Sequence, residues 1–374
     1  MKNGIKKQNY TTSPVVIAAA SIIIIAGLVA ARAIIAPFIL AIFVSIICAE
    51  PVGWLARKKV PKSLAIFLVL TGLIALVGSV GLLLGSSFNQ FTRNIPAYTA
   101  SLNAMFESTI ANLQIPEDIF SVDYLREMID ASSVFGFTAG AIGQVVSILS
   151  NSFIILLVTV FILAESTAFG IKARLLEMVY GRPLDFLNDF RKDVGRYLLL
   201  KTAISLATGL LITLWLKFIG VDFSLLWGVM AFFLNFIPNI GSILAAIPAT
   251  FLALVQFGPS GAILSASGYL SINMVLGNFL EPRIMGRGFS LSPLIVFLSL
   301  ILWGAILGII GMFLAVPLTL ILKIWFDQNE STRWISILMG SEKEAKKMHD
   351  DTKNSKPGST LILPGKFERK KQTP

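Results

Sequence analysis

Apolar residues dominate this chain in long runs, and short polar or basic stretches separate the runs. About 20 consecutive apolar residues are enough to cross the hydrocarbon core of a bilayer as one helix. Two further apolar stretches are each interrupted midway by glycine, and the first of them also by proline. We therefore expect an all-α polytopic membrane protein with about six transmembrane helices and two broken or re-entrant helical hairpins. The helices are expected at about 14–31, 33–49, 63–88, 142–164, 202–219 and 262–280, and the hairpins at 223–254 and 289–322.

The two interrupted stretches are the most informative part of this pattern. A broken helix at membrane depth is tolerated only where its freed backbone groups are buried in protein or line a wet cavity. Paired broken segments in two halves of a sequence indicate the binding site of a transporter. The segment Ala246-Ile247-Pro248 in the first stretch is similar to Ala315-Val316-Pro317 in the second. The similarity indicates an inverted repeat, in which each hairpin follows a helix of opposite direction.

Composition agrees with a membrane protein. Hydrophobic residues make up 55% of the chain and charged residues 14%, whereas a soluble domain carries about 25% charged residues. The net charge of +10 comes from basic residues beside the ends of apolar segments and in the C-terminal tail. This placement is typical of membrane insertion signals, so we expect a lipid bilayer and no nucleic acid as partner.

Charge also predicts orientation and organisation. The N-terminus, the loop near Arg57 and the segment 165–201 are basic, so both termini are expected in the cytoplasm. The segment 89–141 has two basic and six acidic residues and is expected to be an extracytoplasmic helical arm. The expected parts are helices one to three (1–88), the arm (89–141), helix four (142–164), a cytoplasmic amphipathic segment (165–201), the transport core (202–322) and a cytoplasmic tail (323–374), disordered from about 341.

Enzymatic chemistry finds little support. The chain has one cysteine, Cys48, inside an apolar run, and one histidine, His349, in the charged tail. A zinc site needs more cysteine or histidine ligands than this, and a catalytic triad needs a histidine outside a charged tail. The sequence also contains no phosphate-binding loop for ATP. We expect no enzyme, no cofactor and no metal site.

Polar residues near the two breaks are the candidates for lining a substrate or ion path. Half-helix ends present partial charges to a ligand, and polar groups inside membrane helices either bond neighbouring helices or line a pathway. The lining candidates are Asn235, Pro238, Asn239, Gly241, Asn273, Asn278 and Glu281. The gate or hairpin candidates are Arg283, Pro293, Gly304, Gly308, Gly311 and Pro317. The alternatives are a simple packing kink at Pro238, close helix packing at the glycines, and a local ion pair between Glu281 and Arg283.

Three segments of the C-terminal half resemble the autoinducer-2 exporter family of bacterial membrane transporters. They are Phe236–Gly241, the run from Asn278 to Gly286 with the following Leu291–Leu294, and the run from Leu302 to Leu318. The resemblance implies a multi-pass protein of the bacterial inner membrane that exports a small polar solute and assembles as a homo-oligomer, with a pentamer as the implied size. Some members are associated with exchange of Na⁺ or Li⁺ for H⁺, so coupling to Na⁺ or H⁺ stays open, as does a channel-like oligomeric pore.

Overall fold

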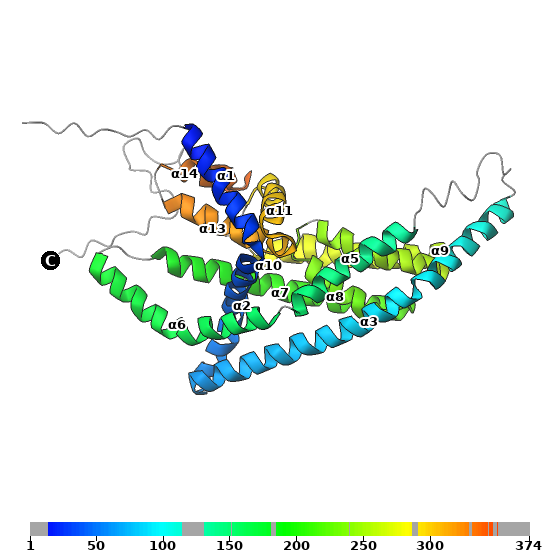
Figure 1. The fold of residues 1–374 in the computed structure, drawn as a ribbon, viewed down its shortest axis with the longest axis horizontal. Coiled ribbons are helices and arrows are strands. Elements are labelled where there is room, and N and C mark those ends of the chain that lie inside the picture. Colours follow the sequence, from blue (N-terminus) through cyan, green and yellow to red (C-terminus); the bar gives the residue numbers. More distant parts are fainter. Residues whose placement is uncertain are drawn as a thin grey trace, which may run out of the picture.

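The computed structural model describes residues 14–113, 131–150, 152–180, 185–238, 240–285, 291–328, 331–342, 344–346 and 350. Within these ranges the protein is helical, with thirteen α-helices and one π-helical segment (Figure 1). The helices are α1 (Pro14–Ala30), α2 (Arg32–Arg57), α3 (Lys62–Leu113), α5 (Ala131–Ser150), α6 (Ser152–Tyr180), α7 (Asp185–Ile219), α8 (Ser224–Leu234), α9 (Ile240–Asn273), η1 (Met274–Leu280), α10 (Glu281–Met285), α11 (Pro293–Leu307), α12 (Ile309–Phe313), α13 (Ala315–Gln328) and α14 (Arg333–Met339).

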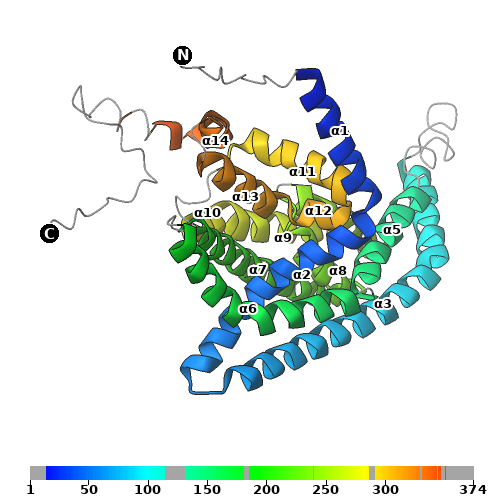
Figure 2. The ribbon, with the colours of Figure 1, turned by 60° about the vertical axis from the view of Figure 1, so that its left-hand side comes forward.

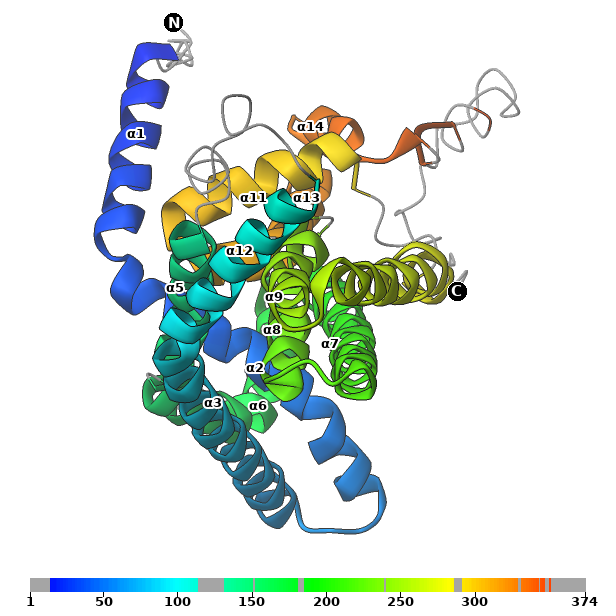
Figure 3. The same ribbon diagram turned by 90° about the vertical axis from the view of Figure 1, so that its right-hand side faces the viewer.

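The structure confirms an all-helical polytopic membrane protein. Five helical stretches are long and apolar enough to cross a bilayer, and α8 and α11 are shorter apolar helices. The five are 32–57, 62–105, 133–166, 194–219 and 240–284. The apolar helix α1, of 17 residues, stands at the edge of the molecule (Figure 3). Its residues Ile22 and Ile23 are largely exposed. Such exposed apolar side chains are expected where the surrounding medium is hydrocarbon.

Helix α3 is much longer than the membrane is thick. Its 52 residues correspond to roughly 78 Å at 1.5 Å per residue, against about 30 Å for a hydrocarbon core. It runs along one side of the molecule, and its C-terminal half lies beside α5 (Figure 2). The described part of the expected arm, to residue 113 and from residue 131, is therefore helical, and α3 continues unbroken through position 88, where we expected the third helix to end.

The arm packs on the core through aromatic rings. Phe91 of α3 lies edge-on to Trp227 of α8 at 5.5 Å and to Phe135 of α5 at 5.8 Å between ring centroids. Phe135 in turn meets Phe251 of α9 at 5.3 Å. Phe91, Phe135 and Trp227 are fully buried, so this contact anchors the arm firmly to the core.

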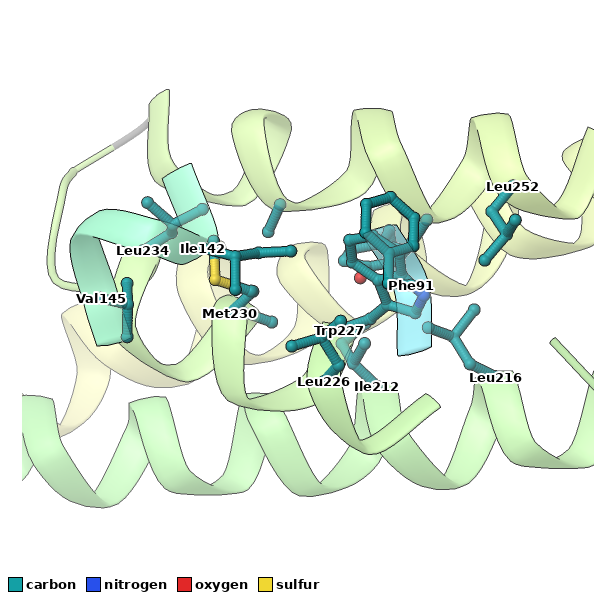
Figure 4. Close-up of a cluster of buried hydrophobic side chains, with 14 of the residues drawn as sticks. Phe91, Ile142, Val145, Ile212, Leu216, Leu226, Trp227, Met230, Leu234 and Leu252 are labelled. Atoms are coloured by element: carbon teal, nitrogen blue, oxygen red, sulfur yellow. The ribbon is translucent and has the colours of Figure 1, made fainter. Parts of the chain in front are cut away.

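The largest core cluster lies where α8 is held between α7 and the first part of α9 (Figure 4). Gly209 of α7 and Gly228 of α8 let these two helices touch backbone to backbone, since a Cβ on Gly209 would lie 2.6 Å from the carbonyl oxygen of Gly228. Small residues at such crossings are how membrane helices achieve close packing. Trp227 fills the cluster beside them and donates its indole N–H to the carbonyl of Asp222, at 3.0 Å.

Helix α9 is two legs joined by a sharp reversal. Gly258 has φ of 69° and ψ of −163°, outside the helical region, and glycine adopts a positive φ without steric cost. Across the reversal the hydroxyls of Thr250 and Ser265 are 3.3 Å apart. Trp215 of α7 lies against Gly268 on the second leg and donates to the carbonyl of Leu264 at 3.0 Å. The first leg follows α8 in sequence after the first break, and the second leg is the sixth long helix expected from the sequence.

The second interrupted stretch also folds back on itself. Gly308, with φ of 70° and ψ of −149°, separates α11 from α12. Beyond it Gly311 lies against the carbonyl of Trp303, and a Cβ on Gly304 would lie 2.9 Å from Met312. The Trp303 indole donates to the Thr319 hydroxyl at 3.0 Å and so ties α11 to α13.

Candidate functional site

A buried ion pair joins α7 to α10, two helices that are far apart in the sequence. The ammonium of Lys201 on α7 donates to both carboxylate oxygens of Glu281, at 2.8 and 2.9 Å. The Lys201 side chain is 4% exposed and that of Glu281 is 21% exposed. Removing charges from water carries a large penalty, which a pair repays only with good geometry and further hydrogen bonds. Charged residues inside membrane segments are rare and mark functional sites.

The sequence around Lys201 explains why it points inward. Tyr197, Lys201 and Ser205 recur every four residues along α7, so they lie on one face of the helix. All three residues are buried. Helix α7 is packed against α8, η1, α10 and α13 among other elements. The Lys201 side chain is thus enclosed by protein, and Glu281 supplies the opposite charge.

Asn235 extends this polar line to the first break. It lies directly after the last residue of α8, and its carboxamide donates to the Ser205 hydroxyl at 2.9 Å. Ser205 is one helical turn from Lys201 on α7. The break of the first hairpin and the Lys201–Glu281 pair are thus attached to neighbouring turns of one helix.

A π-helical segment places Glu281. Helix α9 ends at Asn273, η1 covers Met274–Leu280, and Glu281 begins α10. The backbone N–H of Glu281 donates to the carbonyl of Leu276, five residues earlier. Segments of π-helix are rare in proteins, and those that occur are often found at functional sites. Here the wider turn sets where the Glu281 carboxylate sits relative to α7.

The remaining lining candidates lie in different surroundings. Asn278 is exposed on η1, and Pro238 is half-buried at the break. Gly241 is buried against the carbonyl of Leu234, so it serves the tight reversal after α8. Asn239 lies outside the described residues. The structure therefore brings together Asn235 and Glu281 through α7, and it does not bring Asn278 to them.

Asn273 borders a separate groove of about 580 Å³ between the two legs of α9 and α5. Most of its lining is apolar, with Ser242, Thr250, Tyr269 and Asn273 as the polar residues. The Tyr269 hydroxyl is buried and has no hydrogen-bond partner among the described residues. The groove does not include Lys201, Glu281 or Asn235, so it is distinct from the charged site.

The gate candidates fall into two groups. Gly304, Gly308 and Gly311 form the reversal between α11 and α12, and Pro317 is buried in α13. Pro293 is the first residue of α11, where its missing N–H costs nothing. Arg283 lies 5.8 Å from the Phe279 ring and forms no ion pair with Glu281, whose partner is Lys201. The local Glu281–Arg283 pair considered from the sequence is therefore wrong.

Lys201 and Ser205 are site residues that the sequence pattern did not single out. The available signal was a lysine at the start of an apolar run, four residues after a tyrosine and four before a serine. Its partner is 80 residues away along the chain, and only the packing of α7 against η1 and α10 identifies it. Among the described residues, no group of three His, Cys, Asp or Glu side chains is placed to hold a metal ion.

Helical stretches long enough to span a bilayer, chain reversals within the apolar core and a buried ion pair beside them are features of a polytopic membrane transporter. The sequence profile of the AI-2E family transporters matches residues 18–330. The chain is 40% identical over 321 residues to AI-2 transport protein TqsA of Escherichia coli K12, covering 85% of this chain and 92% of that protein. It is 37% identical to a putative transport protein of Haemophilus influenzae, covering 88% and 96%, and 35% identical to putative transport protein YhhT of E. coli K12, covering 86% and 92%.

The chain therefore belongs to the AI-2E family of transporters. It is a multi-pass membrane transporter of a bacterial family and not an enzyme.

Proposed function

We propose that this protein is a secondary transporter that exports a small polar solute similar to autoinducer-2 across the bacterial inner membrane. The observation that carries the proposal is the Lys201–Glu281 pair, buried where α7 meets the helix that separates the two hairpins. The relative TqsA is named an AI-2 transport protein. A solute with several hydroxyls suits this site, because a paired lysine and glutamate offer both a donor and an acceptor.

We assign recognition to Asn235, Ser205, Lys201 and Glu281. Asn239, next to the first break in sequence, stays a candidate, and Asn273 belongs to the separate groove between the legs of α9. The two hairpins, broken at 235–239 and at Gly308, are re-entrant from opposite sides of the membrane and act as gates.

The proposed topology follows from the charges and the long helix α3. Both termini face the cytoplasm, and the segment 89–141 projects on the outside. The exposed apolar faces of α3, with Phe67, Leu82 and Leu83, are covered by lipid or by neighbouring subunits of a homo-oligomer. A pentamer is the size that the family resemblance implies.

Flux measurements in proteoliposomes test the function. Purified protein is reconstituted and assayed for movement of autoinducer-2 and of a panel of small polar metabolites, with empty vesicles as the blank. Saturable flux of autoinducer-2 or a related polyol, lost in Glu281→Gln, is the expected result. If vesicles that contain correctly assembled protein transport none of these solutes, the proposal is contradicted.

A second function, exchange of Na⁺ or Li⁺ for H⁺, is favoured by the Glu281 carboxylate. Carboxylates within membrane segments carry protons and coupling ions in many transporters. The same vesicles distinguish the two functions: cation-dependent proton movement without any solute indicates exchange, and solute flux that ignores pH and Na⁺ gradients indicates an uncoupled pore.

A further inference from the structure

Helix α14 has two faces of different surroundings, although it is only seven residues long. Ser336 and Met339 are buried, and Ile335 packs against the same core cluster as Met339. On the opposite face Trp334, Ile337 and Leu338 are 61, 41 and 67% exposed. Their spacing of three and four residues forms one continuous apolar stripe, which we call the α14 stripe. A solvated tail would not present such a stripe to water.

Backbone and side-chain contacts fix α14 at the base of the second hairpin. The N–H of Ser292, just before α11, donates to the carbonyl of Met339 at 3.0 Å. Leu291 and Gly340 form an antiparallel bridge. Lys323 of α13 pairs with Glu344 at 2.6 Å. The start of α11 is therefore tied to the end of α14, and α13 is tied to α14 by direct packing and to the residues after α14 by the ion pair.

The α14 stripe lies where the chain leaves the apolar part of the hairpin. The apolar run of α13 ends with Trp325 and Phe326, and Asp327 follows. Trp325 is 55% exposed. Arg333, at the start of α14, lies 3.4 Å from Asp327. Tryptophan is enriched at the level of the lipid headgroups, and basic residues flank membrane segments on the same level.

We propose that α14 is a membrane-interface anchor, whose stripe of Trp334, Ile337 and Leu338 inserts at the boundary between headgroups and acyl chains. This inference rests on the membrane-protein class and not on the solute proposed above. The occupant is lipid and not a second copy of the chain, because a stable protein interface buries about 800 Å² on each partner. A helix of seven residues is only about 10 Å long and offers far less.

The anchor gives the second hairpin a fixed base. Since α11 and α13 are both tied to α14, movement of this hairpin during transport has to occur at the Gly308 end. Short amphipathic helices that lie in the interface in this way bind through buried apolar area together with attraction to anionic lipid.

Site-specific fluorescence tests the anchor in the full-length protein. In a Cys48→Ala background, Leu338→Cys is labelled with an NBD fluorophore and reconstituted into phosphatidylcholine–phosphatidylglycerol vesicles. Glu342→Cys, also exposed on the tail, is the matched control. At position 338 we expect blue-shifted emission that is quenched by shallow spin-labelled lipid and protected from aqueous iodide. At position 342 we expect the opposite pattern.

Two results overturn the proposal. One is emission at position 338 that is quenched by iodide as strongly as at position 342. The other is efficient disulfide formation between Leu338→Cys residues of two copies in the membrane, which would show that protein covers the stripe. Both substituted side chains are exposed, so the variants are expected to fold, and their elution in gel filtration is checked against the parent.

Discussion

Lys201 of α7 holds Glu281 of α10 through both carboxylate oxygens, although the two residues are 80 positions apart. The pair connects α7 to the helix that runs between the two hairpins. Removing one partner leaves the other charge buried and unpaired, whereas changing both together keeps the region neutral. This asymmetry allows the pair to be tested by substitution.

Glu281→Gln is expected to destabilise the protein by about 3–5 kcal/mol, because it leaves the Lys201 ammonium buried without an opposite charge. It is also expected to abolish solute flux. The double variant Lys201→Met/Glu281→Gln should recover most of the lost stability and none of the flux. Melting in detergent and flux in vesicles separate the two effects. Wild-type stability in Glu281→Gln alone would show that the pair is solvated.

Asn235→Leu tests the contact between the first break and α7. It removes the carboxamide that donates to Ser205 and is expected to cost about 1–3 kcal/mol, because the serine hydroxyl loses a buried partner. We expect reduced flux from a protein that still assembles. Asn278→Leu, at an exposed position of η1, is the control and should transport normally; equal loss in both variants contradicts a special role for Asn235.

Gly241→Ala is expected to lower stability as well as flux. An added methyl group meets the carbonyl of Leu234, and crowding of this kind typically costs about 1–3 kcal/mol. Gly143→Ala is the control, because nothing lies within 4 Å of a Cβ there and alanine favours the helix. The comparison is made by thermal melting in detergent. An unchanged melting temperature for Gly241→Ala would mean that the break is easily deformed.

Tyr98→Phe tests how the arm is attached. The Tyr98 hydroxyl donates to the Asp222 carboxylate at 3.0 Å, and the amide of Gln256 donates to the same oxygen. Loss of this hydrogen bond is expected to cost about 1 kcal/mol and to speed hydrogen exchange near Asp222 and Gln256. Thr99→Val removes only a hydroxyl bonded to the carbonyl of Ile95 within α3 and should leave exchange there unchanged.

Cysteine labelling tests the orientation. In a Cys48→Ala background, Ser101→Cys on the arm is expected to react with a membrane-impermeant maleimide added to intact spheroplasts. Arg57→Cys, exposed at the end of α2, should react only after the membrane is opened. The reverse pattern would invert the proposed topology and with it the direction assigned to the hairpins.

The apolar pattern predicted the fold class and the positions of both chain breaks. The break near Pro238 and the reversal at Gly308 were visible because proline and glycine interrupt otherwise continuous apolar runs. The second legs of the hairpins begin at Ile240 and Ile309, so Ala246 and Ala315 follow these starts by the same number of residues. Ala246 lies inside α9, whereas Ala315 begins α13 after the short helix α12. The repeat itself stays a prediction.

The charged site was harder to predict, because its partners come from distant segments. Periodicity places Lys201 on a face of α7 but does not say which acidic residue reaches it, and the nearby Arg283 offered a local alternative. Helix α14 was also missed, since the sequence of the tail is charged overall while the packing of Ile335 and Met339 depends on the second hairpin.

The reversal at Gly258 has a mechanical consequence. Its two legs follow each other without an intervening loop, and the hydroxyls of Thr250 and Ser265 meet across them. The first leg belongs to the first hairpin. The second leg leads through η1 to Glu281 and, further along the chain, to the second hairpin. We therefore expect a shift of either leg to be passed on to the other, which couples the movements of the two hairpins.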